Sequence, residues 1–266
     1  MIRSSEPLHG VLHLQDAMGV CMTLLRGERE ALLVDTGYGL EDVGAAVREM
    51  ADTPVRVLLT HGHHDHVLGA QWFAETFLAE EDREEFRLRT GAEQREKVRR
   101  QAEEKGLAVP ECWRTAEIPM PRALDFDRKT GPFDSLRLDL GGLTAEIIKV
   151  PGHTPGSCVV YVPERELLLS GDNWNPCTWL WFPCSVGAVV WRENMRELMA
   201  LCPFRHVLWS HQPMLKTRAD LAALVEGITD AVLQGAPAVD MGSDIDTHEA
   251  RLPDGSQVLV FDRGKL

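Results

Sequence analysis

The stretch Thr60-His61-Gly62-His63-His64-Asp65-His66 places four histidines and one aspartate within seven residues. Residues 55–59 before it are mainly apolar or β-branched and follow Pro54, which predicts a buried strand. Residues 67–73 after it can begin a helix. The histidines are therefore expected on a loop at the end of a strand, where the site residues of layered α/β proteins usually lie.

This loop has the composition of a metal site. Imidazole and carboxylate are ligands of zinc and similar ions, and neutral histidine is the commonest metal ligand. His61 and His63 are two residues apart and can point the same way, whereas Asp65 and His66 follow at a bend and can reach a second point nearby. The alternative, a polar loop of exposed histidines, gives no reason for the clustering.

Further predicted strands end in potential ligands. A lone histidine or aspartate after a strand is more often a cap or a turn residue. Together with the histidine loop, however, these residues supply one more histidine for each of two ions and an acid able to bridge them. They are His153 after residues 147–150, Asp172 after residues 167–169 and His211 after residues 207–209.

The order of these motifs resembles the metallo-β-lactamase superfamily. The chain contains H-x-H-x-D-H at residues 61–66, G-H-T-P-G at residues 152–156 and S-G-D at residues 170–172, followed by a strand-end histidine. The resemblance runs from about Leu32 to His211, most of the chain, and the joint pattern is highly specific. It implies an α+β fold, the four-layer αββα sandwich of the metallo-β-lactamase type.

The resemblance also implies a ligand set and a metal. Zn²⁺ is expected, about two ions per chain, with iron or manganese as alternatives. His64 occupies the variable position of the motif and is not expected to be a ligand. The first ion is expected at His61, His63 and His153, and the second at Asp65, His66 and His211, with Asp172 bridging both.

Differences between this sequence and individual groups of the superfamily limit which activities are expected. The β-lactamases that bind two zincs lack an acid at the position of Asp172, which disfavours antibiotic cleavage. Flavodiiron relatives carry glutamate at the position of His63, so the histidine favours zinc. Glyoxalase II enzymes share the ligands and the bridging acid, but they have a longer helical C-terminal region than the 55 residues, 212–266, that follow His211 here.

The composition is that of a compact globular enzyme. The 266 residues can form one domain with a sizeable core, and 44% of them are hydrophobic. The formal charge of −13 disfavours nucleic acid, because phosphate backbones need a positive footprint. Residues 1–7 contain no apolar signal segment, and no apolar run reaches membrane-spanning length. The six cysteines lack C-x-x-C spacing and most of them are expected to be core residues in a reducing compartment, which predicts a cytoplasmic protein. A small-molecule substrate is expected, without a nucleic-acid or membrane partner.

One order of elements occurs twice along the chain. Residues 31–37 predict a strand that ends in an acid, and a helix over residues 40–50 separates it from the strand before the histidine loop. Residues 166–172 again predict a strand that ends in an acid, followed by a helix over 192–201 and a strand over 206–209. The repetition predicts two βαβ-like halves within a single domain over residues 1–266, with helices outside packed sheets.

Other residues are expected near the metals. Metal-bound histidines usually donate their second N–H to a carboxylate or carbonyl, and we interpret Asp35 as such an acceptor; the alternative is a cap on its own turn. Residues 80–120 predict a charged helical insertion with a break at Thr90-Gly91, and whether it is a lid is left open. Thr60 and Thr154 are further candidates beside the ligands. An apolar pocket is expected to be walled by Tyr38, Trp174, Trp179 and Trp181, with the tryptophans on a loop over residues 174–183. The alternative for the tryptophans is that they fill the core.

The expected activity is attack by a metal-bound hydroxide on the carbonyl carbon of a small, partly apolar ester, thioester or lactone. Asp65 or Asp172 is expected to relay a proton, and no G-x-S-x-G nucleophile elbow is present. The alternatives are a phosphodiesterase on the same two ions and a sulfur dioxygenase on one iron. A structural metal site is the remaining alternative, although it would need only a closed set of ligands.

Overall fold

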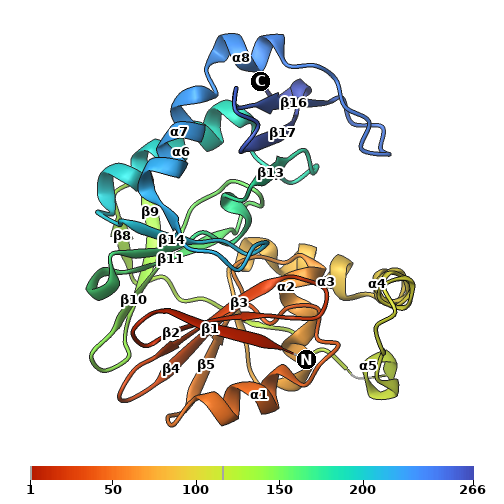
Figure 1. The fold of residues 1–266 in the computed structure, drawn as a ribbon, viewed down its shortest axis with the longest axis vertical. Coiled ribbons are helices and arrows are strands. Elements are labelled where there is room, and N and C mark those ends of the chain that lie inside the picture. Colours follow the sequence, from red (N-terminus) through yellow and green to blue (C-terminus); the bar gives the residue numbers. More distant parts are fainter. Residues whose placement is uncertain (1, 116) are drawn as a thin grey trace. The chain divides into compact units, whose positions relative to one another are not determined.

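The computed structural model describes residues 2–115 and 117–266, which form two compact units. Unit 1 comprises the chain up to Asp125 together with Arg137–Ala145 and Ser210–Pro213. Unit 2 comprises Phe126–Leu136, Glu146–Trp209 and Met214–Leu266. Figure 1 labels their helices and strands. The single domain over residues 1–266 stays a prediction.

Unit 1 is built on a seven-stranded sheet whose strands lie in chain order. The pairs from β1 to β4 are antiparallel and those from β4 to β7 are parallel. Strand β4 is buried over its whole length, which explains its unbroken apolar run. The strands are β1 Arg3–Leu8, β2 Val11–Gln15, β3 Cys21–Arg26, β4 Ala31–Val34, β5 Val55–Leu58, β6 Phe77–Leu78 and β7 Arg122–Ala123.

The parallel pair of β4 and β5, with helix α1 (Val43–Met50) between them in the chain, carries the histidine loop. Helix α1 begins at Asp42, whose carboxylate accepts a hydrogen bond from the Ala45 backbone N–H at 2.7 Å. The predicted helix and strand are confirmed, with the helix beginning at residue 43 rather than 40. After β5 the chain forms α2 (His64–Val67) and then the 3₁₀ turn η1 (Leu68–Trp72).

The charged insertion lies between β6 and β7 and is helical, as predicted. The break at Thr90-Gly91 separates two of its helices. The insertion is also anchored, because Trp113 is buried and its indole N–H donates to the backbone oxygen of Tyr38 at 3.1 Å. Residue 116 lies outside the described residues. The elements of the insertion are η2 Glu80–Asp82, α3 Arg83–Thr90, α4 Ala92–Glu104 and α5 Glu111–Thr115.

The second seven-stranded sheet has the order β15-β14-β12-β11-β10-β9-β8, and most of it lies in unit 2. Strands β12 and β14 pair in parallel, and helix α6 (Ala188–Leu201) lies between them in the chain. This confirms the predicted repetition of strand, helix and strand. The strands are β8 Arg128–Thr130, β9 Phe133–Asp139, β10 Thr144–Lys149, β11 Cys158–Val162, β12 Leu167–Leu169, β14 His206–Leu208 and β15 Lys216–Thr217.

Unit 2 also contains a three-stranded sheet that the sequence did not predict. Strand β13 (Cys177–Leu180) pairs in parallel with β17 (Val258–Asp262), which pairs antiparallel with β16 (Thr247–Arg251). The prediction of a loop over residues 174–183 is therefore wrong, because a partner strand from the end of the chain makes part of it a strand. The remaining elements are η3 Pro163–Arg165, η4 Gly171–Asn173, α7 Arg218–Gly227, α8 Asp230–Gly235 and η5 Arg263–Lys265.

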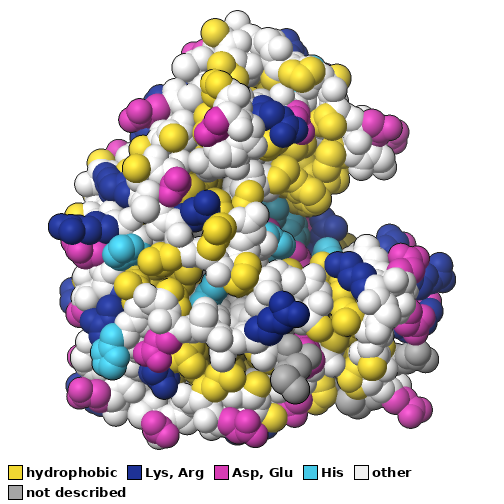
Figure 2. Space-filling view, viewed as in Figure 1, with side chains coloured by type: hydrophobic (Ala, Val, Ile, Leu, Met, Phe, Trp, Pro, Cys, Tyr) yellow, Lys and Arg dark blue, Asp and Glu magenta, His cyan; other side chains and the backbone are white. Residues whose placement is uncertain are grey.

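The surface has mixed charge. Figure 2 shows acidic and basic side chains interspersed on the face in view, without a continuous basic region. Among the described residues, no helix is both long enough and apolar enough to cross a membrane.

Candidate metal centre

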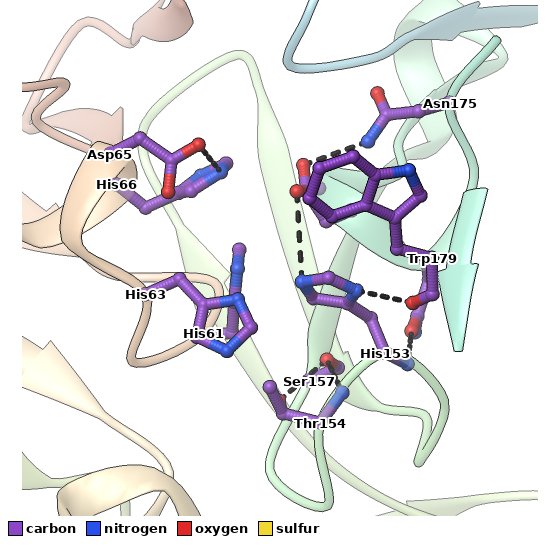
Figure 3. A network of polar contacts seen from close by, with 12 residues as sticks. His61, His63, Asp65, His66, His153, Thr154, Ser157, Asn175 and Trp179 are labelled. Atoms are coloured by element: carbon purple, nitrogen blue, oxygen red, sulfur yellow. Dashed lines mark hydrogen bonds and ion pairs between the residues drawn. The ribbon is translucent and has the colours of Figure 1, made fainter. Parts of the chain in front are cut away.

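Unit 1 holds His61, His63, Asp65, His66 and His211 and brings these predicted ligands close together; Figure 3 labels the first four. The ring centroid of His61 lies 4.8 Å from that of His63 and 4.1 Å from that of His66. Oδ2 of Asp65 lies 3.7 Å from Nε2 of His66 and 3.7 Å from Nε2 of His211. The rings of His61, His63 and His66 are buried.

The backbone of the loop aims these side chains. His63 precedes α2, and its carbonyl accepts hydrogen bonds from the N–H groups of His66 and Val67 at 3.0 and 3.2 Å. The chain thus turns from an extended loop into a helical turn between the first two predicted ligands, His61 and His63, and the next two, Asp65 and His66. His211 follows β14, and the carbonyl of the preceding Ser210 accepts from the N–H of Cys21 at 2.7 Å.

Asp35 is the buried acceptor behind the histidine loop. Its Oδ1 accepts from the Thr60 N–H at 2.7 Å, and its Oδ2 accepts from the Thr60 hydroxyl at 2.9 Å and from Nδ1 of His66 at 2.8 Å. Asp35 follows β4 with a φ of 65°, a left-handed conformation that aspartate and asparagine adopt more readily than most residues. A neutral His66 ring whose Nδ1–H group donates a hydrogen bond to Asp35 carries on Nε2 the lone pair that a metal needs.

Thr60 extends this arrangement to His61. Its hydroxyl proton goes to Asp35, so its oxygen accepts from Nδ1 of His61, 3.1 Å away. A neutral His61 ring that donates through Nδ1 carries its lone pair on Nε2.

Unit 2 holds the other two predicted ligands, His153 and Asp172. Nδ1 of His153 donates to the Trp179 carbonyl at 2.7 Å (Figure 3), and the His153 N–H donates to Oδ1 of Asn173 at 2.9 Å. The side-chain amide of Asn175 donates to Oδ1 of Asp172 at 2.8 Å, while Oδ2 lies 3.7 Å from Nε2 of His153. Both ligand atoms are thus oriented by groups of their own unit.

The donor set of each unit fits zinc. Tetrahedral ligands about 2.1 Å from zinc lie about 3.4 Å from one another. The nitrogen–oxygen separations of 3.7 Å in unit 1 and in unit 2 are close to this value. Imidazole nitrogen and carboxylate oxygen are zinc ligands, and a neutral histidine that donates through Nδ1 offers its Nε2 lone pair, as metal binding requires.

The neighbouring candidates contact other groups. The ring of His64 meets that of Tyr38 edge-on at 5.6 Å, and burial lowers the pKa of the His64 imidazole. The Thr154 hydroxyl shares a hydrogen bond of 2.7 Å with the hydroxyl of Ser157. Asp16 accepts the N–H of Tyr38 at 2.9 Å, so the backbone at Tyr38 is held as well.

The tryptophans divide between the core and the surface of unit 2. Trp174 is fully buried and its indole N–H donates to Gln257 at 2.6 Å, so the prediction that it walls a pocket is wrong. Trp179 is 39% exposed. Its ring centroid lies 5.8 Å from that of Trp181, which stacks on Phe182 at 4.5 Å. The alternation of strand β13 turns these rings away from the core that holds Trp174.

The sequence did not predict three residues that contact the proposed ligands: Asn173, Asn175 and Glu85. The asparagines follow the predicted bridging acid within three residues, and that closeness was a usable signal. Glu85 Oε2 lies 3.6 Å from Nε2 of His63 and accepts from Nε of Arg89 at 3.1 Å. These contacts, that of His63 first, lower the pKa of the Glu85 carboxyl to about 2. No sequence signal separates Glu85 from the other charged residues of the insertion.

Comparison with known families settles the membership of this chain. Residues 17–213 match the model of the family described as the metallo-beta-lactamase superfamily. This chain is a metallo-β-lactamase superfamily protein. The superfamily consists mostly of hydrolases and typically binds metal ions. The predicted fold, α+β and of the αββα metallo-β-lactamase type, is confirmed.

Two curated proteins resemble this metallo-β-lactamase superfamily member over part of their length. The probable metallo-hydrolase YqgX of Bacillus subtilis (strain 168) is 28% identical over 149 residues, which are 56% of this chain and 63% of YqgX. The hydroxyacylglutathione hydrolase GloC of Haemophilus influenzae (strain ATCC 51907 / DSM 11121 / KW20 / Rd) is 27% identical over 161 residues, 57% of this chain and 65% of GloC. The chain thus spans less than two thirds of each relative.

A solved structure shows the same fold. The metallo-beta-lactamase from Pontibacter korlensis superimposes with a TM-score of 0.57 at 17% identity, over 85% of this chain and 98% of that protein. At this identity the likeness concerns the fold alone.

Proposed function

We propose that this superfamily member is a hydrolase that binds two zinc ions and cleaves a small, partly apolar ester, thioester or lactone. The observation that carries the proposal is the approach of Asp65 Oδ2 to the Nε2 atoms of His66 and His211, 3.7 Å in each case. The proposed ligands are His61, His63 and His153 for one ion, Asp65, His66 and His211 for the other, and Asp172 for both.

When bound, a pair of zinc ions supplies an acidified water at neutral pH and a Lewis-acid contact for the substrate oxygen. The role proposed for the protein itself is to keep its ligands in one protonation state and to move a proton. Asp35 and the Trp179 carbonyl hold the Nδ1 protons of His66 and His153. Asp65 and Asp172 are the proposed proton relays.

Asn175 gives the two oxygens of Asp172 different environments. Its amide donates to Oδ1, whereas Oδ2 faces Nε2 of His153. The hydrogen bond stabilises the ionised carboxylate and limits its rotation. Oδ2 is therefore the oxygen that Asn175 leaves open toward the proposed metal centre.

The surface of unit 2 supports an apolar acyl group. Figure 2 shows hydrophobic side chains gathered where Figure 1 places β13, the strand that carries the half-exposed Trp179. Each buried CH₂ contributes about 0.8 kcal/mol. The relative named hydroxyacylglutathione hydrolase supports an acyl substrate as well. A small-molecule substrate without a nucleic-acid or membrane partner, and a cytoplasmic location, belong to the same proposal.

Kinetics on a matched substrate panel test this function. An aryl ester, an acyl thioester and a lactone are compared with a bis-aryl phosphodiester, using zinc-loaded and chelator-stripped protein. The best acyl substrate should be at least about tenfold faster in kcat/KM than the phosphodiester. Stripping should abolish turnover and zinc should restore it.

The alternatives give different results in the same experiment. Preference for the phosphodiester would replace the acyl proposal by a phosphodiesterase. One iron per chain, with oxygen consumed on a persulfide substrate, would replace the hydrolase by the dioxygenase.

A further inference from the structure

Helix α3 of the insertion packs directly on the ligand loop of unit 1. The N–H of Gly62, between two of the proposed ligands, donates to Oδ2 of the buried Asp82 at 2.9 Å. A Cβ atom at Gly62 would lie 2.7 Å from the backbone oxygen of Asp82 and 2.7 Å from the backbone nitrogen of Phe86. The loop therefore approaches the helix more closely than any side chain at residue 62 would permit.

The same face of α3 brings a carboxylate to His63. Oε2 of Glu85 lies 3.6 Å from Nε2 of His63, and the two side chains are 16% and 6% exposed. One turn later on the helix, Nε of Arg89 donates to the same oxygen at 3.1 Å. Glu85 is thus held between a surface cation and a proposed metal ligand.

This contact distinguishes the two nitrogens of His63. The nitrogen that faces Glu85 is Nε2, so the proton of a neutral ring belongs there and the lone pair belongs on Nδ1. His61 and His66 have the opposite arrangement, because their Nδ1 atoms face Thr60 and Asp35. A carboxylate at the far nitrogen fixes the tautomer of a metal-binding imidazole and raises its basicity.

We propose that Glu85 is a positioning residue for the metal centre: it fixes His63 as the Nε2–H tautomer and turns Nδ1 toward the first ion, with Arg89 holding Glu85 in place. The insertion is then a support for the ligand loop. The proposal rests on the proposed function in one respect, that His63 binds metal. The separation of 3.6 Å is longer than a hydrogen bond, and it is expected to shorten in the zinc-loaded protein.

The test compares two neighbouring substitutions on α3. Glu85→Gln keeps the size of the side chain and removes the charge beside His63. Glu84→Gln makes the same change at a side chain that is 69% exposed and paired with Arg87. Zinc affinity is measured by chelator competition on the apoprotein, and the tautomer of His63 is measured by ¹⁵N NMR of its ring in the metal-free protein.

Glu85→Gln should weaken the tighter zinc site by about 10–100-fold and reduce the Nε2–H fraction of His63, whereas Glu84→Gln should change neither. An affinity within about twofold of the Glu84→Gln protein, or an unchanged His63 tautomer, would overturn the proposal. If Glu85→Gln does not fold, Arg89→Met provides the second variant, with a smaller loss in the same direction. A wild-type protein that binds no zinc would refute the proposed function, while the tautomer comparison would still decide the role of Glu85.

Discussion

Replacing Asp35 by asparagine keeps the shape of the side chain and removes the carboxylate that holds Thr60 and His66. The residue is 2% exposed, and its side chain accepts three hydrogen bonds, at 2.7, 2.8 and 2.9 Å. The amide oxygen of asparagine can still accept from the Thr60 N–H. The amide nitrogen would then face the Thr60 hydroxyl and Nδ1 of His66, both of which donate to Asp35 now.

The magnitude follows from those two contacts. A buried hydrogen bond to a charged group contributes about 1.5–3 kcal/mol, so losing both would cost about 3–6 kcal/mol of unfolding free energy. Rotation of the Thr60 hydroxyl and transfer of the His66 proton from Nδ1 to Nε2 relieve part of this, which leaves an expected loss of about 3 kcal/mol. Asparagine accepts the φ of 65°, so backbone strain adds little.

The tautomer change has its own consequence. With its proton on Nε2, His66 has no lone pair on the side of Asp65, and zinc affinity should fall by about 10–100-fold. Urea denaturation of the apoprotein and chelator competition measure the two effects. Asp42→Asn is the matched control, because asparagine caps helix α1 as well as aspartate does. An Asp35→Asn protein whose stability and zinc affinity equal those of Asp42→Asn would refute the role given to Asp35.

Three further predictions concern the same unit. Gly62→Ala should cost about 1–3 kcal/mol in urea denaturation because its Cβ would lie 2.7 Å from backbone atoms, whereas Gly91→Ala, with its nearest contact at 3.6 Å, should change little; equal effects would contradict the close packing of α3. His63→Ala should lower the zinc content by about one ion per chain and His64→Ala should not, and equal zinc losses would show that the assignment within the motif is wrong. Burial lowers the pKa of His13 from 6.5 to about 4, so the unfolded chain binds its proton first and stability should fall by up to about 3 kcal/mol between pH 6.5 and pH 4. Denaturation curves of His13→Gln should lack this part of the pH dependence, and curves that run parallel to wild type would refute it.

The sequence predicted those helices, strands and breaks that depend on residues close together in the chain. The strand before the histidine loop, the helix after Asp42 and the break at Thr90-Gly91 each follow from a run of apolar residues, a cap or a glycine. Strand β13 was missed because its pairing partner, β17, lies about eighty residues later in the chain and no local pattern records that pairing. The same cause misplaced Trp174, whose burial depends on a contact with Gln257.

In the site, the types and the order of the residues predicted the candidate ligands, but they did not predict most of the groups that contact those ligands. A proposed ligand such as His66 can be recognised from its motif, and Asp35 from its place at the end of a strand. Glu85 could not be predicted, because its role depends on how helix α3 packs on Gly62, and one glutamate among many on a charged helix carries no periodic signal. The hydrogen bond from His153 to the Trp179 carbonyl could not be predicted from the sequence either, because every residue has a backbone carbonyl.

The most direct test of the two-ion account is the number of zinc ions per chain in wild-type, His66→Ala and Asp172→Asn proteins, measured by elemental analysis after loading and removal of excess metal. The account predicts about two ions in the wild type and about one in each variant, because it assigns His66 to one ion and Asp172 to both. One ion in the wild type, or two in the Asp172→Asn protein, would contradict it.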